Sequence, residues 1–298
     1  MSPEPDAAGG EASGQLVLWL AATSLVLALS AALPVGVPGR SGVLLVAGLG
    51  VGCRPRLLHH PGIWFGLAAG FAMVVALAPD NAGNHHFLAG YLGLATGLVV
   101  GGQGAGWQAQ WACNARWLLV GVMGFATLQK LLSPEYLRGE FWAYFLSLGM
   151  AGKLVFATGL WDGAVEVFRE NRNGLAVFVA GDPAVGGEVV LAEPFPYFRT
   201  VVMGLTWVVV VIEAMIAVAF ASGRAGARWP HYLLIGFVGA LILVRPEVEF
   251  AAILLALGAI VAVHGRAPSA LHWVYAAGIG LCGLLSLLLQ GRELGVPL

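Results

Sequence analysis

The sequence predicts an all-α fold, a polytopic transmembrane helical bundle of about 8–9 helices with a small extracytoplasmic β-hairpin-like insert. Three observations support this class. Hydrophobic residues make up 59% of the chain and charged residues only 10%, whereas soluble domains carry about 25% charged residues. Apolar runs close to membrane length recur along the chain. The 43 glycines are typical of membrane helices, in which small residues let backbones approach closely.

Composition and spacing divide the chain into four regions. Residues 1–14 are small, acidic and rich in Pro and Gly, which predicts a disordered N-terminal tail. We expect residues 15–159 to hold the N-terminal transmembrane helices and the candidate site. Residues 160–196 form a polar insert, and residues 197–292 hold the C-terminal transmembrane helices.

Apolar runs near 17–25 residues predict membrane spans. The clear ones are Gln15–Pro34, Gly62–Ala78, His86–Gly102, Arg116–Leu132, Thr200–Ser222, His231–Val244, Phe250–His264 and Leu271–Gln290. Ser41–Cys53 is apolar but short, so it either forms a ninth span or does not cross. Phe141–Leu160 is interrupted by charge and is either a span or a re-entrant or interfacial helix.

Arginines in short loops favour the cytoplasmic side of a membrane. Such loops contain Arg54, Arg56, Arg224, Arg228 and Arg266, whereas the segment Asp80–Asn84 carries no positive charge. These loops agree with one topology if Phe141–Leu160 does not cross. We then expect a multi-pass protein of a cell membrane, namely the bacterial cytoplasmic membrane, with residues 160–196 on the extracytoplasmic side.

The insert contains two short apolar, β-branched stretches, Gly174–Ala180 and Glu188–Ala192, separated by Gly-Asp-Pro-Ala-Val-Gly-Gly. This pattern is typical of a β-hairpin with a longer loop. The hairpin is either a structured surface loop or, with a more specific role, a lid or a hairpin that docks a partner.

The net charge and the cysteine positions limit the classes of partner and ligand that the chain is expected to bind. A net charge of −1 predicts no nucleic-acid partner, because such partners select strongly basic faces. Cys53, Cys113 and Cys282 lie far apart in apolar surroundings and are interpreted as buried thiols. No cluster has zinc spacing, so no metal is predicted. The expected partners are the lipid bilayer and either another membrane protein or a second copy of the chain.

Ionisable residues inside membrane segments are costly and are therefore candidate functional residues. The predicted topology puts one set toward the outer face: His85, His86, Lys130, Glu135, Arg138 and Glu140, with Arg245, Glu247 and Glu249 on the same side. A second set lies toward the inner face: Arg116, His231 and, some way into its helix, Glu213. Glu213 is either neutral or paired with Arg116 or His231, as a structural pair or as a proton relay.

The sequence Asn84-His85-His86 opens one predicted helix, and Lys130 closes the next. Antiparallel neighbours would bring both ends to one membrane face. A desolvated lysine can act as a base in its neutral form, and a neutral histidine can hydrogen-bond to a developing oxyanion. The structural alternative is a lysine that extends to the interface and a histidine that caps its helix.

Two stretches resemble a known family. The run NHHFLAGYL, from Asn84 to Leu92, resembles the Asn-His-x-Tyr-Leu-x-Gly-Leu-Leu stretch of vitamin K-dependent γ-glutamyl carboxylase. Arg116, then Lys130 with Tyr136 and Gly139, is similar to that family's Arg…Lys-Lys-Leu-Asp-x-Asp-Trp-x-x-Gly stretch. The wider superfamily, which has bacterial members, is called the horizontally transferred transmembrane domain (HTTM).

The resemblance implies a chemistry. Lys130 would match the lysine that deprotonates a reduced naphthoquinone, which is menaquinol or a vitamin K-like quinol. His85 would match the histidine that stabilises the anion at the carboxylation step. The reduced quinone would react with dioxygen to yield the base that removes a carbon-bound proton.

The sequence departs from the family pattern at several positions. Gln129 stands where the family has the first of two lysines, and Ser133-Pro134-Glu135-Tyr136 replaces Asp-x-Asp-Trp. Residues 160–196 are too short to replace the family's large lumenal region that binds the substrate's propeptide. A retained scaffold with a different substrate and one without catalysis both fit these differences.

Three functions therefore compete. The first is a carboxylase-like, quinol-dependent membrane enzyme with Lys130 and His85 at its centre and Asn84 beside them. The second is a non-catalytic membrane subunit that packs in a larger membrane protein complex. The third, a transporter or channel, would need polar residues along a path through the membrane, and Glu213 is almost alone at mid-membrane depth.

Overall fold

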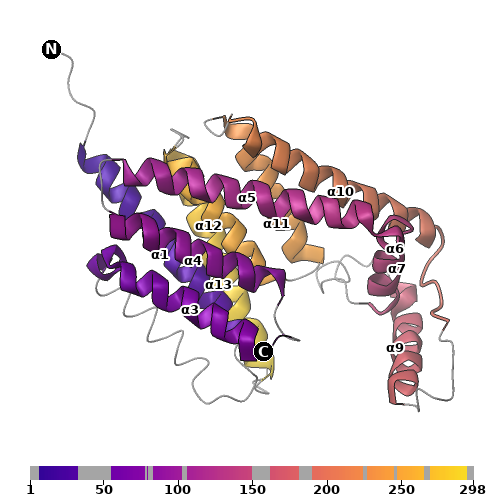
Figure 1. Ribbon diagram of the computed structural model, residues 1–298. Coiled ribbons are helices and arrows are strands. Elements are labelled where there is room, and N and C mark those ends of the chain that lie inside the picture. The colour runs from indigo at the N-terminus through magenta and orange to yellow at the C-terminus, as the bar shows by residue number, and fades with distance from the viewer. Residues whose placement is uncertain are drawn as a thin grey trace. The chain divides into compact units, whose positions relative to one another are not determined.

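The part of the chain that the structure describes is built from helices (Figure 1). The structure is a computed structural model, which describes residues 7–32, 55–77, 79, 83–102, 106–149, 162–180, 190–223, 227–244, 247–264 and 269–293. All regular elements in these ranges are α- or 3-10 helices, with no strand among them. The all-α class predicted from the sequence is therefore confirmed.

Each of the clear apolar runs coincides with a helix. These helices are α1 (Ala7–Ala32), α3 (Pro61–Leu77), α4 (Asn84–Gly102), α5 (Trp107–Leu132), α10 (Phe198–Ala221), α11 (Arg228–Val244), α12 (Val248–His264) and α13 (Ser269–Glu293). Phe198–Ala221 and Ala270–Leu288 are long and apolar enough to cross a membrane. Helix α1 begins at Ala7, so Ala7–Gly14 is helical instead of disordered. Its alanines and Glu11 favour extension of the apolar helix toward the N-terminus.

The structure bears on one of the two apolar runs that the sequence left undecided as membrane spans. Ser41–Cys53 lies outside the described residues. Within Phe141–Leu160, helix α7 (Glu140–Ser147) ends after eight residues, and Gly149 then adopts a left-handed φ of 63°. Eight helical residues extend only about 12 Å, against a hydrocarbon core of about 30 Å. The helix therefore ends within the described part of this run, residues 141–149, and residues 150–160 lie outside the described residues.

The chain forms two compact units. The first comprises residues 1–122, 216–238 and 247–298, and the second comprises residues 123–215 and 239–246. Helices α5, α10 and α11 each contribute residues to both units.

Helix α12 is the centre of the first unit. It contacts α1, α4 and α13, and every residue from Ala251 to Ala262 is buried. A helix that is apolar on all sides is stable only when neighbours cover it. Helix α3 packs against α4, and the indole N–H of Trp111 in α5 donates a hydrogen bond to Oγ1 of Thr96 in α4 over 2.9 Å.

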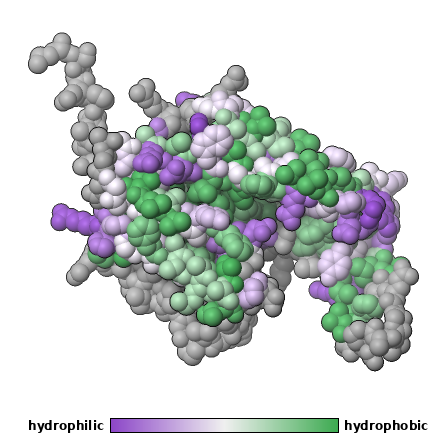
Figure 2. Space-filling model, viewed as in Figure 1, coloured by the Kyte–Doolittle hydropathy of each residue, from purple (hydrophilic) through white to green (hydrophobic). Residues whose placement is uncertain are grey.

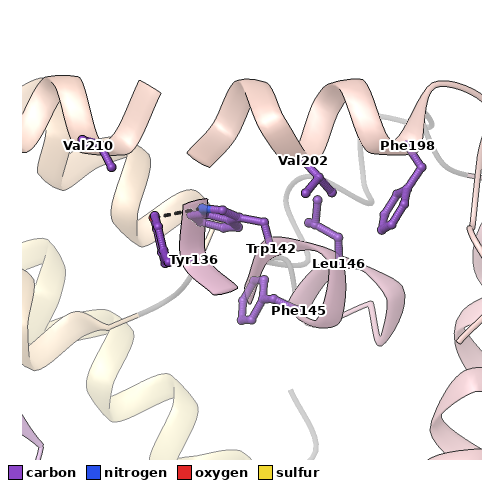
Figure 3. Close-up of a cluster of buried hydrophobic side chains, with 7 residues drawn as sticks. All are labelled: Tyr136, Trp142, Phe145, Leu146, Phe198, Val202 and Val210. Atoms are coloured by element: carbon purple, nitrogen blue, oxygen red, sulfur yellow. Dashed lines mark hydrogen bonds between the residues drawn. The ribbon is translucent and has the colours of Figure 1, made fainter. Parts of the chain in front are cut away.

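The second unit has an aromatic core, shown in Figure 3. Short helices α6 (Pro134–Leu137) and α7 pack there against α10, and the buried residues are Tyr136, Trp142, Phe145, Leu146, Phe198, Val202 and Val210. Helix α6 begins where the sequence signals a start. Ser133 caps it by accepting a hydrogen bond from the Tyr136 N–H over 3.1 Å, and Pro134 occupies the first turn.

A glycine permits the turn between α6 and α7. Gly139 has a φ of 77°, in the left-handed region. A Cβ at this position would lie 2.5 Å from Cγ1 of Val202 in α10. Both the backbone conformation and the close approach of α10 therefore require glycine at this turn.

The polar insert is helical where the sequence predicts its first strand. Gly174–Ala180 belongs to α9 (Val165–Ala180), which follows the short 3-10 helix η3 (Asp162–Ala164). The described residues 190–194 of the second half have no regular structure. The strand prediction for Gly174–Ala180 is thus wrong. Phe168 and Asn171 are buried at helical spacing, and such packing overrides the strand preference of the β-branched residues that follow.

A single side chain links α9 to the chain on either side of it. The Nδ2 of Asn171 donates to the carbonyl oxygens of Ser147 and Ala192 over 2.8 Å and 2.9 Å. Its Oδ1 accepts the Ala192 N–H over 2.8 Å. Asn171 and Ser147 are both buried, so the bond between them satisfies polar groups that water does not reach.

Replacing Asn171 with alanine is expected to loosen α9 and residues 190–197 while the rest of the chain stays folded. Loss of the amide removes the hydrogen bond to the carbonyl oxygen of buried Ser147, at a cost of about 1–3 kcal/mol. The two bonds to Ala192 are lost as well. Hydrogen exchange followed by mass spectrometry would detect faster exchange in these two segments. The matched control is Asn173→Ala, since Asn173 is exposed on the same helix. Equal exchange in both variants would contradict the assigned role of Asn171.

Candidate functional site

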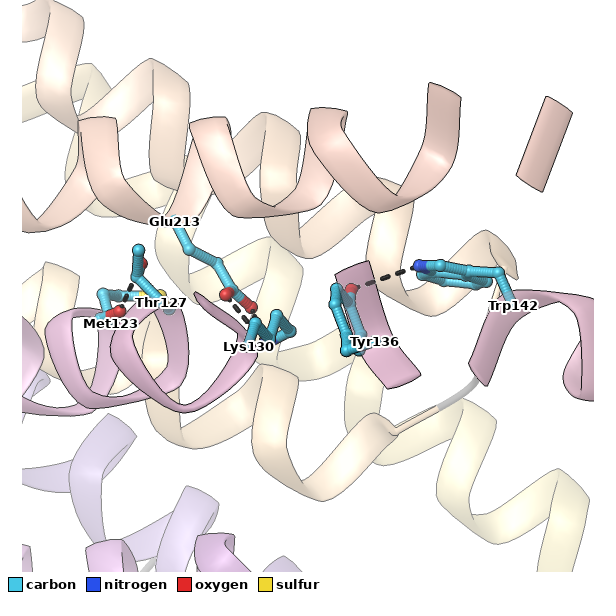
Figure 4. Close-up of polar contacts among 6 residues, drawn as sticks. All are labelled: Met123, Thr127, Lys130, Tyr136, Trp142 and Glu213. Carbon is cyan, nitrogen blue, oxygen red and sulfur yellow. Dashed lines mark hydrogen bonds and ion pairs between the residues drawn. The ribbon is translucent and has the colours of Figure 1, made fainter. Parts of the chain in front are cut away.

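A buried ion pair joins α5 to α10 in the second unit (Figure 4). The Nζ of Lys130 lies 2.8 Å from both Oε1 and Oε2 of Glu213 and donates a hydrogen bond to each. Side-chain exposure is 22% for Lys130 and 8% for Glu213. The Glu213 side chain is thus almost wholly removed from solvent, and the Lys130 side chain is mostly buried.

The helices that carry the pair explain why it forms. Glu213 follows an unbroken apolar run in α10, so its carboxylate has no polar neighbour within its own helix. Thr127, one turn before Lys130 in α5, returns its hydroxyl to the Met123 carbonyl over 2.9 Å. The Thr127 hydroxyl therefore donates its hydrogen bond to Met123 and not to Glu213. An unpaired charge in this position would be strongly destabilising, and Lys130 supplies the opposite charge.

An aromatic ring lies on another side of the ammonium. The Nζ of Lys130 is 5.6 Å from the ring centre of Tyr136, which follows Lys130 on α6. The Tyr136 hydroxyl oxygen accepts the indole N–H of Trp142 over 3.1 Å (Figure 4). Burial raises the pKa of Tyr136 to about 12; the hydrogen bond from Trp142 acts in the opposite direction, and the Glu213 carboxylate adds to the rise. Tyr136 is therefore neutral at physiological pH.

The histidines of the candidate site begin α4, in the first unit. The rings of His85 and His86 lie 4.1 Å apart between their centres. The N–H of Gly83 donates to Nδ1 of His86 over 3.0 Å, and His86 is buried beside Phe71. His85 is half-buried, and Asn84 at the helix start is exposed. Since Lys130 belongs to the second unit, the convergence of His85 with Lys130 stays a prediction.

The other sequence candidates have separate surroundings. Nδ1 of His231 lies 2.8 Å from the Tyr275 hydroxyl, and the His231 ring meets Phe220 edge to face. The guanidinium carbon of Arg116 lies 5.4 Å from the ring centre of Trp117.

The remaining two acids of the motif region are exposed. Glu140 forms an ion pair with Arg138 over 2.7 Å. Glu135 is exposed on α6. The hydrogen bond that the exposed Arg138 guanidinium donates to Glu140 raises the pKa of Arg138. Exposed pairs of this kind contribute little to stability.

Glu213 has a partner that was not predicted from the sequence. Its carboxylate accepts hydrogen bonds from Lys130 within the second unit. Arg116 and His231 belong to the first unit, so their pairing with Glu213 stays a prediction. The sequence pattern placed Lys130 toward the outer face and Glu213 toward the inner face, whereas their side chains meet in the structure.

The arrangement offers a carboxylate and an amine that share one buried space. The pair is neutral overall, and a proton can pass between the two groups without a change of net charge. Among the residues that the structure describes, no group of three or more His, Cys, Asp or Glu side chains could hold a metal ion. The sequence pattern did not reveal Trp142 as part of the site. The Ser133-Pro134 helix-start signal could have indicated that Tyr136 turns back toward Lys130.

Comparisons of the chain with protein-family models, with curated proteins and with solved structures found no match.

Proposed function

We propose that this chain is a multi-pass integral membrane protein whose Lys130–Glu213 pair exchanges protons with a reduced naphthoquinone. The observation that carries the proposal is the pair itself. Glu213 lies within α10, which is long and apolar enough to cross a membrane, and its carboxylate is bonded to Lys130. Ionisable groups at such positions are expensive and are mostly retained for function.

The exposed surfaces of α10 and α13 are apolar, as expected for helices in contact with lipid. Large apolar side chains are exposed along α10 and α13, namely Trp207, Val208, Val211, Met215, Val218, Trp273, Val274, Leu281, Leu284, Leu287 and Leu288. Hydrophobic side chains also cover much of the face in Figure 2. Soluble proteins rarely expose apolar patches of this extent. We place the protein in the bacterial cytoplasmic membrane, with residues 160–196 outside.

The pair can perform the proton transfer that the resemblance to the carboxylase family implies. The Lys130 ammonium can pass a proton to the Glu213 carboxylate, which leaves a neutral amine. The amine can then accept the proton of a quinol hydroxyl, and the electron pair of the broken O–H bond stays on the quinol oxygen. Reaction of the quinol with dioxygen yields a quinone epoxide and water, so that atoms and electrons balance.

The expected result for Lys130→Ala is loss of quinol-dependent epoxide formation, because the variant has no amine to accept the proton. The assay uses purified protein in lipid nanodiscs with reduced naphthoquinone and oxygen, and the epoxide is detected by chromatography. Arg199→Met is the control, because Arg199 pairs with Glu193 at the exposed start of α10. Epoxide formation by Lys130→Ala at the wild-type rate would refute the proposal, as would a wild-type protein that neither forms epoxide nor retains quinone.

A second candidate, a non-catalytic membrane subunit, is favoured by the exposed apolar end of α9. Val177, Phe178 and Val179 there are 74%, 48% and 74% exposed. Such a surface suits contact with another membrane protein. Purification of a larger complex that lacks bound quinone would support this function over the first.

A further inference from the structure

Lys130 has a second partner besides Glu213. Its Nζ lies 5.6 Å from the centre of the Tyr136 ring. A cation within about 6 Å of an aromatic face is attracted by the ring electrons. Tyr136 is buried, so little water competes for this contact.

The Tyr136 ring is fixed by its surroundings. Its hydroxyl oxygen accepts the indole N–H of Trp142, over 3.1 Å. Trp142 in turn meets Phe145 edge to face, with ring centres 5.9 Å apart, and Phe141 with ring centres 5.4 Å apart. Tyr136 itself stacks on Phe141, with ring centres 5.7 Å apart. Rotation of the Tyr136 ring away from Lys130 would break both the hydrogen bond and the stacking.

We propose that Tyr136 is a positioning residue whose ring, anchored by Trp142, holds the Lys130 ammonium against Glu213 and shields it from the outside. The inference deepens the proposed function and rests on it for its chemical meaning. Shielding on the Tyr136 side directs proton exchange of Lys130 toward Glu213. Tyr136 acts through Lys130 and does not itself transfer the proton.

The lysine content of the chain permits a site-specific test. Lys130 and Lys153 are its two lysines, so acylation of one can be measured against the other in the same sample. The full chain in detergent, without quinol, is treated briefly with acetyl N-hydroxysuccinimide and digested. Mass spectrometry then gives the ratio of Lys130 to Lys153 acetylation for each variant.

Tyr136→Leu is expected to raise this ratio by about 2- to 30-fold, as loss of a cation–π contact implies. Tyr136→Phe is the matched control, since it keeps the ring and loses only the hydroxyl, and its ratio is expected to stay below that of Tyr136→Leu. Trp142→Phe removes the anchor and is expected to give an intermediate ratio. A residue that served packing alone would change the unfolding temperature without changing the ratio.

The outcomes decide the inference in each case. A folded Tyr136→Leu protein with the wild-type ratio would overturn it, as would Tyr136→Phe with a ratio as high as that of Tyr136→Leu. If Tyr136→Leu does not fold, Trp142→Phe decides: a raised ratio supports the positioning role, and an unchanged ratio overturns it. Because no quinol is present, a failed epoxide assay would leave this result intact.

Discussion

Replacing Lys130 with methionine is expected to destabilise the protein by about 3–5 kcal/mol, the usual cost of removing one partner from a buried ion pair. Methionine has a similar volume and fills the space of the lysine stem. The loss of stability therefore measures the cost of leaving the Glu213 carboxylate without a cation in its buried position, where it is 8% exposed. Lower pH is expected to lessen the loss, because protonation removes the charge that burial penalises.

Removing the other partner, or both partners, should change the stability by different amounts. Glu213→Leu leaves an ammonium that can move its flexible stem toward solvent, so we expect a smaller loss than for Lys130→Met. The double variant leaves no charge, and apolar replacement of both partners of a buried pair is often neutral or stabilising. We therefore expect the double variant to be more stable than Lys130→Met alone.

Unfolding in detergent, followed by circular dichroism, would measure these differences. Arg199→Met is the control, because the Arg199–Glu193 pair is 69% and 49% exposed. Exposed pairs contribute about 0–1 kcal/mol, so this variant should behave nearly as the wild type. Equal losses for Lys130→Met and Arg199→Met, or additive losses in the double variant, would show that the buried pair has no such energetic role.

Gly139→Ala is expected to cost roughly 2–5 kcal/mol. A left-handed backbone costs an L-residue with a side chain about 1–2 kcal/mol, and Gly139 has a φ of 77°. The added methyl group would also lie 2.5 Å from Cγ1 of Val202, which is itself fully buried. Overpacking of this kind costs about 1–3 kcal/mol. The turn that brings α7 onto α10 would therefore shift or open.

Gly204→Ala is the matched control for this substitution. Gly204 lies within α10, near Val202, and a Cβ there meets no atom within 4 Å. Alanine in a helix is favoured over glycine by about 0.5–1 kcal/mol, so the control should be neutral or slightly more stable. Thermal unfolding of both variants measures the contrast. Gly139→Ala unfolding at the same temperature as Gly204→Ala would mean that the turn tolerates a side chain.

Much of the fold could be predicted from the chain, because helices are local structures. Apolar runs such as Thr200–Ser222 and Phe250–His264 coincide with α10 and α12, and neither run contains a proline. The prediction failed at Gly174–Ala180, where a short β-branched stretch lies in α9. Short apolar runs are ambiguous between strand and helix, and burial of the preceding turn decided this one.

The candidate site was only partly predictable. Lys130 and Glu213 were both recognised as unusual charges in apolar segments, since each stands out from its neighbours along the chain. Their partnership was not recognised, because they are 83 positions apart. Local sequence does not predict which face of α10 packs toward Lys130 of α5.

By itself, the sequence determined the helical class, the bounds of most helices and the residues that are costly to bury. These properties depend on neighbours within a few turns along the chain. Only the tertiary structure decided that Glu213 bonds to Lys130, that the Tyr136 ring lies beside the ammonium, and that Trp142 hydrogen-bonds to Tyr136. Packing of α6 and α7 against α10 sets the side-chain positions, and that packing requires the left-handed turn at Gly139 and its contact with Val202.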